Sequence, residues 1–260
     1  MHADVEKFQE PKRNCATEDC EDAASVGDKP LEFDLELHEL RVAIADGASE
    51  ALLAKFWARR IVDELATDGI GSEAAYHRAL DRAINAWPGF LDSYKLRRES
   101  DGKPIQWYEE PGLAKGAYAT ALSLRLQGGA KRPWQCFATG DSCMFQIRDD
   151  VLIAVHPLTS SAEFGTSPAL IPSRPLDWDL VRSRTTSCQG TWQGEDMIFL
   201  ATDALSAWIL AEHEASRPPW NCLGDLGTAD HPPFSDWVAS RREAGRMKDD
   251  DATLVRIHLW

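Results

Sequence analysis

Three aspartates stand beside short apolar runs of the kind that form β-strands. Residues 41–45 lead into Asp46, residues 197–202 lead into Asp203, and Asp250 comes just before the closing run 254–257. A strand holds the carboxylate at its end in a fixed place, and hard divalent cations such as Mg²⁺ and Mn²⁺ need several oxygen ligands that converge on one point. We therefore interpret these residues as ligands of a metal-dependent hydrolase.

Each aspartate also has a simpler interpretation. Asp46-Gly47 is a common turn sequence, because glycine tolerates positive φ and aspartate bonds its own backbone. Asp203 suits the N-cap of a helix over residues 204–214, and residues 249–251 form an acidic cluster that water can solvate. The combination, rather than any one member, favours a metal site.

The order of these motifs resembles that of the type 2C protein phosphatases, the metal-dependent PPM class of serine/threonine phosphatases, and in particular their bacterial branch. The matching segments, in chain order, are Glu21-Asp22, Asp46-Gly47, Gly140-Asp141-Ser142, Asp203-Ala204 and Asp250-Asp251-Ala252-Thr253. The resemblance extends over residues 12–260, which we expect to form a single phosphatase-like domain. Residues 1–11 are expected to be a flexible N-terminus.

The resemblance implies a phosphoprotein phosphatase in which two Mn²⁺ or Mg²⁺ ions activate water for attack on phosphoserine or phosphothreonine. By the same resemblance, Asp46 would bridge the ions and the Gly47 carbonyl would bind one of them. Asp203 and Asp250 would complete the coordination of the other ion.

Two further parts of the implied ligand set are less specific. Glu21 or Asp22 would act as a ligand directly or through water. Asp141 is either a ligand of a third, weaker ion, as the resemblance implies, or a structural turn residue.

The chain also departs from the family pattern. Many members have a histidine two residues after the bridging aspartate as a general acid, and this chain has Ala48. Eukaryotic members have a phosphate-binding arginine where this chain has Thr17, and Arg13 is the nearest substitute or else an exposed basic residue. These departures favour an alternative, a catalytically weak phosphatase-like domain that binds a phosphoprotein or signalling partner. Hydrolysis of a small phosphorylated metabolite is a third possibility.

Composition restricts the partners. The formal net charge of −14 opposes binding to nucleic acid or anionic membrane, which depends on Lys and Arg. The N-terminus is too polar for a signal peptide, so we expect a cytoplasmic, monomeric protein that acts on a phosphorylated protein and opposes a kinase. The six cysteines form no paired metal-binding motif, which favours reduced thiols over disulfides or zinc.

Hydrophobic periodicity predicts the elements that position these residues. Strands are expected at residues 31–37, 40–45, 122–126, 135–139, 144–148 and 151–156, and helices at 49–65, 72–87, 203–214 and 235–245. Pro88-Gly89 is expected to interrupt the second helix, and residues 157–177 to form an irregular loop. Because many strands follow one another directly, the pattern suits antiparallel sheets rather than βαβ units. We predict an α+β fold, a four-layer αββα sandwich of two antiparallel sheets flanked by helices.

Overall fold

Two antiparallel sheets form the centre of the computed structural model, which describes all residues except 28, 31–32, 50, 68–70, 166 and 175–177. The larger sheet has the order β3-β1-β13-β12-β8-β9 and the smaller has β11-β7-β6-β4-β2. The larger sheet consists of β1 (His2–Glu10), β3 (Phe33–Glu36), β8 (Cys143–Arg148), β9 (Val151–His156), β12 (Met197–Ala201) and β13 (Ala252–Leu259). The smaller consists of β2 (Ala23–Ser25), β4 (Glu39–Ala45), β6 (Ala121–Gln127), β7 (Pro133–Thr139) and β11 (Thr186–Thr191). A separate short pair is formed by β5 (Tyr118–Ala119) and β10 (Ile171–Pro172).

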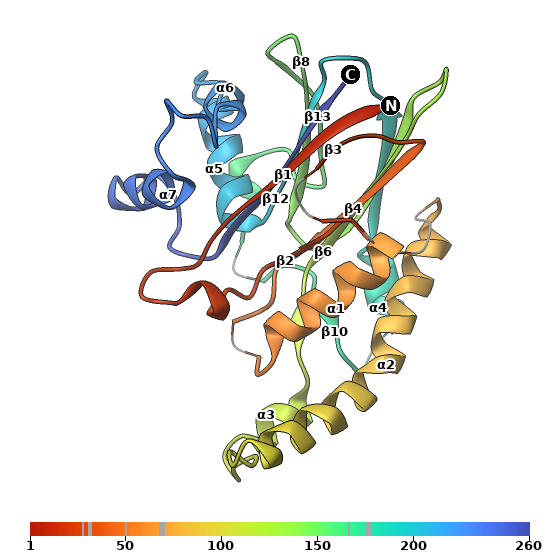
Figure 1. The fold of residues 1–260 in the computed structure, drawn as a ribbon, viewed down its shortest axis with the longest axis vertical. Coiled ribbons are helices and arrows are strands. Elements are labelled where there is room, and N and C mark those ends of the chain that lie inside the picture. The colour runs from red at the N-terminus through yellow and green to blue at the C-terminus, as the bar shows by residue number, and fades with distance from the viewer. Residues whose placement is uncertain (28, 31–32, 50, 68–70, 166, 175–177) are drawn as a thin grey trace.

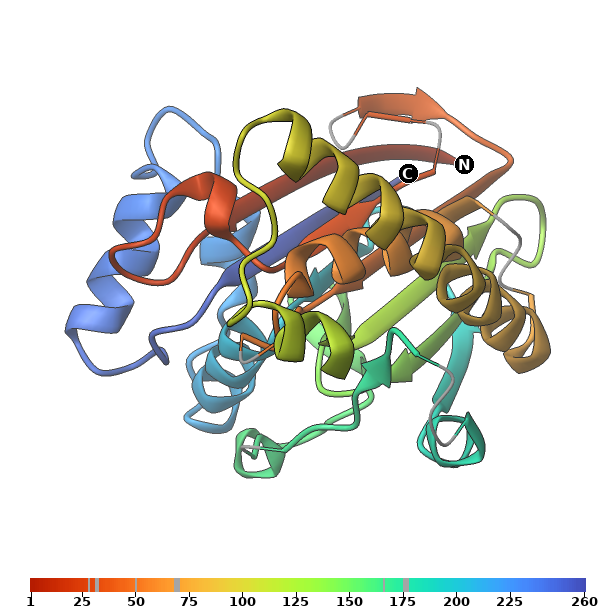
Figure 2. The same ribbon diagram turned by 90° about the horizontal axis from the view of Figure 1, so that it is seen from below.

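Helices cover the outer face of each sheet (Figure 1). On the smaller sheet lie α1 (Ala54–Thr67) and α2 (Glu73–Ser100), and on the larger lie α5 (Asp203–Glu214), α6 (Trp220–Gly224) and α7 (Phe234–Glu243). The shorter elements are η1 (Thr17–Asp19), α3 (Glu110–Lys115), η2 (Ser161–Glu163) and α4 (Trp178–Ser183). Figure 2 shows the same arrangement from below, with the blue helices on the left of the sheets. The predicted αββα sandwich is confirmed.

Period-two alternation along the strands accounts for these layers. In β4, Val42 and Ile44 face the apolar space between the sheets, whereas Ala43 and Ala45 face the core beneath α1 and α2. In β12, Ile198 points between the sheets and neighbouring strand residues pack against α5. Each fully buried aliphatic side chain contributes about 2 kcal/mol of transfer free energy. Because both faces of these strands carry such side chains, both faces are stabilised by packing.

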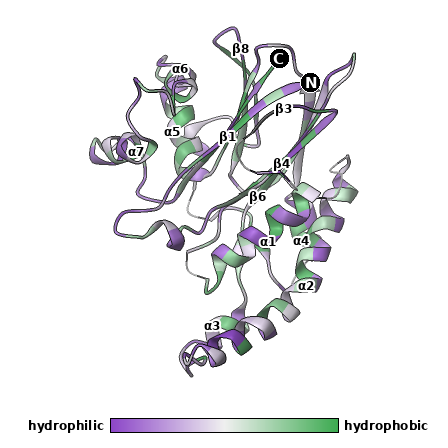
Figure 3. Cartoon of the chain, in the orientation of Figure 1, coloured by the Kyte–Doolittle hydropathy of each residue, from purple (hydrophilic) through white to green (hydrophobic). Residues whose placement is uncertain are grey.

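The second helix differs from the prediction, because α2 continues through Pro88 to Ser100. A proline inside a helix costs about 3 kcal/mol, since it removes one backbone hydrogen bond and crowds the preceding turn. Aromatic packing on both sides of the proline offsets this cost. The Trp87 and Phe90 rings stack with centroids 4.8 Å apart, and Trp87 also meets Trp57 of α1 edge-on at 5.2 Å. Figure 3 shows that the end of α2 nearest α3 carries many hydrophilic residues, coloured purple.

Other boundaries also differ from the sequence analysis. Residues 1–11 are not a flexible terminus, because β1 pairs with β13 from Ala3 to Glu10 and with β3 at its start. The first helix begins at Ala54 rather than near Ser49. The strand predicted at residues 31–37 corresponds to β3, and its first two residues lie outside the described part of the chain. The loop expected at residues 157–177 contains η2 and the short strand β10.

Candidate metal centre

The acidic residues singled out in the sequence all lie at one end of the sandwich. The strand pairing shows this, because Ala45 at the end of β4 is opposite Ala23 at the start of β2. In the larger sheet, Ala201 at the end of β12 is opposite Cys143 at the start of β8. It is also opposite Leu254, near the start of β13. The residues just beyond these ends, which we call the acidic centre, are Glu21, Asp22, Asp46, Asp141, Asp203 and Asp250.

Asp46 is held by the backbone on both sides. Its carbonyl oxygen accepts a hydrogen bond from Thr120 N at 2.8 Å, and Ala48 N donates to Tyr118 O at 2.9 Å. Gly47 between them packs so closely that a Cβ there would lie 2.8 Å from Glu21 O. The same Cβ would lie 2.9 Å and 3.0 Å from the carbonyl carbon and oxygen of Ala54. Only glycine allows the loop after β4 to approach both the Glu21-Asp22 segment and the start of α1.

Asp22 is buried and only half of its carboxylate is hydrogen-bonded. Thr202 Oγ1 donates to its Oδ2 at 2.8 Å and itself accepts from Thr253 N at 3.0 Å, which ties Asp22 to the ends of β12 and β13. Its Oδ1, like Asp141 Oδ1, is a buried oxygen with no hydrogen-bond partner among the described residues. Such oxygens are costly in a folded protein unless a cation or another donor approaches them.

Burial and mutual repulsion shift the pKa values of these carboxyl groups upward. Burial, with the charge of Asp251, raises the pKa of Asp22 to about 8, and burial, with Asp203, raises that of Asp141 to about 7. The pKa of Asp46 is raised well above its usual range by burial and then by Asp22 and Asp203. The carboxylates are therefore close enough for their charges to interact strongly.

Asp203 and Asp250 are bridged by a lysine that the sequence analysis did not single out. Lys248 Nζ lies 3.1 Å from Asp203 Oδ2 and 2.6 Å from Asp250 Oδ2. The pKa of Lys248 is raised, because its partial burial is outweighed by the hydrogen bond to Asp250 and the charge of Asp203. Burial and the charge of Asp250 raise the pKa of Asp203, an effect that Lys248 opposes.

A second lysine lies at the other side of the centre. Lys12 Nζ donates to Glu21 Oε2 at 2.8 Å and to Ser49 Oγ at 2.9 Å. Asp251 holds this loop, because its carboxylate accepts from Lys12 N at 2.8 Å and from Glu21 N at 2.6 Å. Arg13, the predicted phosphate ligand, is exposed and is anchored through its backbone N–H, which donates to Asp249 Oδ1 at 3.1 Å.

The candidate ligand atoms have the chemistry that a hard divalent cation requires, but they do not converge on one point. The candidate ligands are carboxylate oxygens, two of them buried and unpartnered, which is what Mg²⁺ and Mn²⁺ prefer. Within the described residues, no group of three or more His, Cys, Asp or Glu side chains is close enough to hold an ion as the side chains stand. Binding would therefore require these side chains to move closer together.

A groove of about 670 Å³ leads away from the acidic centre. Its lining includes Glu21 and Ser49, Leu52 and Lys55 around the start of α1, and Tyr108 before α3. Asp19 of η1 and Tyr108, from the segment that joins α2 to α3, both line this groove.

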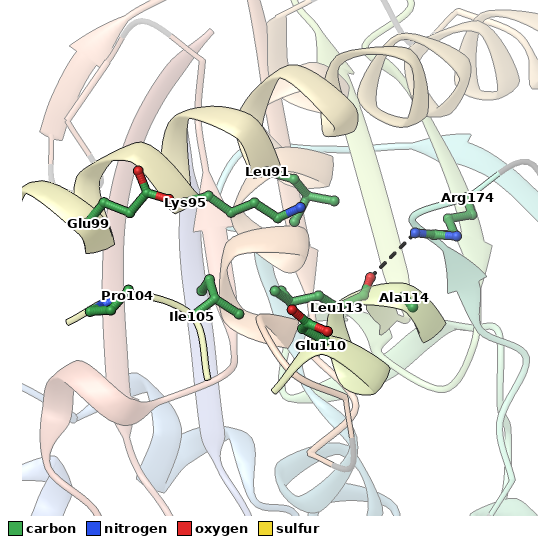
Figure 4. A pocket seen from close by; sticks show the side chains of 9 residues that line it. All are labelled: Leu91, Lys95, Glu99, Pro104, Ile105, Glu110, Leu113, Ala114 and Arg174. Carbon is green, nitrogen blue, oxygen red and sulfur yellow. Dashed lines mark hydrogen bonds between the residues drawn. The ribbon is translucent and has the colours of Figure 1, made fainter. Parts of the chain in front are cut away.

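Another cavity, of about 460 Å³, lies between α2 and α3 (Figure 4). Lys95 and Glu99 of α2 face Glu110 and Leu113 of α3 there, and Arg174 donates to Leu113 O at 3.5 Å. None of the candidate metal ligands lines it. Of the two, only the groove is lined by a candidate ligand, Glu21.

The structure brings most of the predicted site residues together and adds others. Asp22, Asp46, Asp141, Asp203 and Asp250 interact through their charges, whereas Arg13 stays at the surface. The sequence analysis missed the roles of Lys12, Lys248 and Thr202. Their only sequence signal is proximity to a motif, Lys248 two residues before Asp250 and Thr202 directly before Asp203.

Two other expectations can be compared with the structure. The six cysteines are free thiols, as predicted, with Cys20, Cys136 and Cys143 buried. In the part of the chain that is described, no helix is both long and apolar enough to cross a membrane.

Comparison with solved structures finds the same fold in serine/threonine phosphatases. The photosystem II phosphatase PBCP has a TM-score of 0.57 at 13% identity, over 99% of each chain. The Mycobacterium tuberculosis phosphatase PstP/Ppp has a TM-score of 0.54 at 14% identity, over 100% of this chain and 99% of that one. The catalytic domain of PstP in complex with two manganese ions has a TM-score of 0.54 at 13% identity, over 99% of this chain and 98% of that one. No family model and no curated protein matches the chain. The chain thus has the PPM phosphatase fold, as its motifs predicted.

Proposed function

We propose that this protein is a metal-dependent phosphoserine/phosphothreonine phosphatase that acts on a phosphorylated protein and opposes a kinase. The observation that carries this proposal is the set of acidic residues gathered from five strand ends, with the buried Oδ1 atoms of Asp22 and Asp141 unpartnered among the described residues. A structure similar to this one, the PstP catalytic domain, was solved with two manganese ions. Mutually repelling carboxylates at the same end of the same fold support a similar use here.

In this proposal each residue has a defined task. Asp46, fixed by its backbone bond to Thr120, and the carbonyl of Gly47 would hold the cations on the side of β4. Asp203 and Asp250 would hold them on the side of β12 and β13. When bound, two divalent cations lower the pKa of a shared water and offset the charge on a phosphoryl group.

The remaining carboxylates support that core. Asp22, with a free Oδ1, is the inner member of the acidic pair, whereas Glu21 is held by Lys12 and faces the groove. Asp141, whose Oδ1 is also unpartnered among the described residues, would hold a further, weaker cation. Ala48 cannot donate a proton, so protonation of the leaving group falls to water.

The groove favours a peptide over a small phosphate ester as the substrate. It offers an apolar surface at Leu52, the aromatic ring of Tyr108 and the charge of Lys55 to residues that flank a phosphorylated side chain. A small metabolite would contact only the end near Glu21 and Ser49.

The first test is phosphate release from a phosphothreonine peptide and from p-nitrophenyl phosphate in millimolar Mn²⁺. Asp46→Asn should lower both rates by orders of magnitude and should remove most of the thermal stabilisation that Mn²⁺ gives the wild type. Asp149→Asn is the matched control, because Asp149 lies in the exposed turn after β8, where its φ of 49° suits asparagine. A wild type that neither binds Mn²⁺ nor releases phosphate would refute the proposal.

A second test separates peptide from small-molecule substrates. Tyr108→Ala should raise KM for the peptide and leave KM for p-nitrophenyl phosphate unchanged. Trp107→Ala is the control, because Trp107 is also an exposed aromatic residue, 81% against 65% for Tyr108, but does not line the groove. Equal KM values for the peptide in wild type and Tyr108→Ala would favour a small phosphorylated metabolite.

One observation favours the alternative of a catalytically weak, phosphoprotein-binding domain. Lys248 already neutralises Asp203 and Asp250, and Ala48 leaves no general acid after the bridging aspartate. Such a protein would bind a phosphoprotein while its wild type released phosphate no faster than the Asp203→Asn variant.

A further inference from the structure

The ammonium group of Lys248 occupies the position between two carboxylates where a cation would be bound. Its Nζ contacts Oδ2 of Asp203 at 3.1 Å and Oδ2 of Asp250 at 2.6 Å. The other oxygen of each carboxylate is committed to the backbone. Ala204 N donates to Asp203 Oδ1 at 2.6 Å, and Asp251 N donates to Asp250 Oδ1 at 3.0 Å. Both oxygens that remain for a ligand are therefore taken by the same lysine.

The backbone around Lys248 is held by its neighbours, whereas most of its side chain is exposed to solvent. Met247 before it is 6% exposed and packs in the core under α7, and Asp251 after it is 3% exposed. Arg242 holds the same segment, because it donates to the Asp250 carbonyl and, at 2.8 Å, to Pro11 O. The Lys248 side chain is 60% exposed, so it can turn into water without disturbing the core.

We propose that Lys248 is a built-in counter-ion that must leave Asp203 and Asp250 before a divalent cation binds there, and that it thereby sets the metal affinity of this half of the centre. The inference rests on the proposed function, because it concerns the same carboxylates. It adds a competition between the chain's own cation and the metal. Asp46 and Asp22 have no such competitor among the hydrogen bonds and ion pairs of the described residues, so the two halves of the centre should differ in affinity.

The competition follows from charge and space. An ammonium and a divalent cation cannot both lie within bonding distance of the same two oxygens, and each is stabilised there by the same negative charge. Because Lys248 is largely exposed, each of its two ion pairs is weakened by solvent. Together they correspond to about a tenfold reduction in metal affinity.

The test compares wild type, Lys248→Met and Lys248→Gln after the metal has been removed with a chelator. Titration calorimetry with Mn²⁺ measures stoichiometry and affinity, and urea unfolding measures stability with and without saturating Mn²⁺. Lys131→Met is the matched control, because Lys131 is an exposed lysine in the bend before β7, at the end of that strand remote from the acidic centre.

Both Lys248 variants should bind Mn²⁺ about tenfold more tightly than wild type at one of two sites. Without metal they should be less stable than wild type, since two carboxylates lose their counter-ion. In saturating Mn²⁺ this difference should largely disappear, because Lys248 no longer pairs with the two carboxylates in the metal-bound wild type. A merely structural ion pair would instead lower stability equally in both conditions.

Failure of this inference differs from failure of the proposed function. If wild type binds two Mn²⁺ ions and the Lys248 variants bind them with equal or lower affinity, the competition is refuted and the metal centre stands. If neither wild type nor the variants bind Mn²⁺, the proposed function is itself refuted, and the inference with it.

Discussion

Gly47→Ala should destabilise the protein by about 3 kcal/mol, because the added methyl group has no space. The nearest atoms to a Cβ at this position are backbone atoms of Glu21 and Ala54, at 2.8 to 3.0 Å. Carbon contacts are comfortable at about 3.5 Å, so the loop after β4 must move by roughly half an ångström or more. Overpacking costs about 1–3 kcal/mol, and the upper end applies because no flexible side chain can yield.

Urea unfolding and thermal melting measure this loss, which corresponds to a melting temperature lowered by roughly 10 °C. Gly165→Ala is the control, because a Cβ there would meet nothing within 4 Å. Under the proposed function, Gly47→Ala should also weaken the stabilisation by Mn²⁺, since the loop carries Asp46. If Gly47→Ala is as stable as Gly165→Ala, the close packing of the β4 loop is not what the geometry indicates.

Three further predictions concern other parts of the molecule. Arg148→Met should lower the free energy of unfolding by about 2 kcal/mol. Asp196 is fully buried and accepts hydrogen bonds at 2.7 Å from two nitrogens of Arg148, so the substitution leaves a buried charge without its counter-ion. An unchanged urea midpoint would contradict this prediction. Glu212, whose pKa is lowered to about 2 chiefly by Arg217, contributes stability that is present above its unfolded pKa and is lost as pH falls between about pH 5 and pH 2. Glu212→Gln should therefore flatten that part of the stability profile, and an equally steep profile would argue against the ion pairs. Ala48→His should raise turnover of a phosphoserine peptide more than that of p-nitrophenyl phosphate, because the alkyl leaving group needs a proton; equal gains would exclude the general-acid role.

The sequence predicted those parts of the fold that depend on local patterns. The alternating residues of β4, followed by Asp46-Gly47, marked both the strand and the carboxylate at its end. The turn after β8 was equally local, since Asp149 and Asp150 adopt positive φ values of 49° and 61°. By contrast, β2 is only Ala23–Ser25, three small residues with no period of their own, and it exists because β4 lies beside it. The continuation of α2 past Pro88 likewise depends on aromatic packing from another helix.

The contacts of the two lysines in the candidate site could not be predicted from the sequence, because they also depend on which elements meet in space. A carboxylate at a strand end is placed by its own strand, so its position follows from the chain near it. A lysine reaches about 6 Å from its backbone, so its partner is decided by which elements meet in space. Lys248 is near Asp250 in sequence, but its contact with Asp203 joins the ends of β12 and β13. Lys12 reaches Ser49 in the same manner, across 37 residues.

The place of β13 in the larger sheet has a consequence for how the protein is made. β13 lies in the interior of the sheet, between β1 and β12. Because β13 follows both of these strands in the chain, the sheet cannot be completed until β13 has been synthesised, and until then β1 and β12 each present an open edge that favours aggregation. Asp250, just before β13, reaches the centre in the same event. A chain whose synthesis stopped before Asp250 would therefore lack both β13 and this candidate ligand. We expect such a chain to be unfolded rather than folded and inactive.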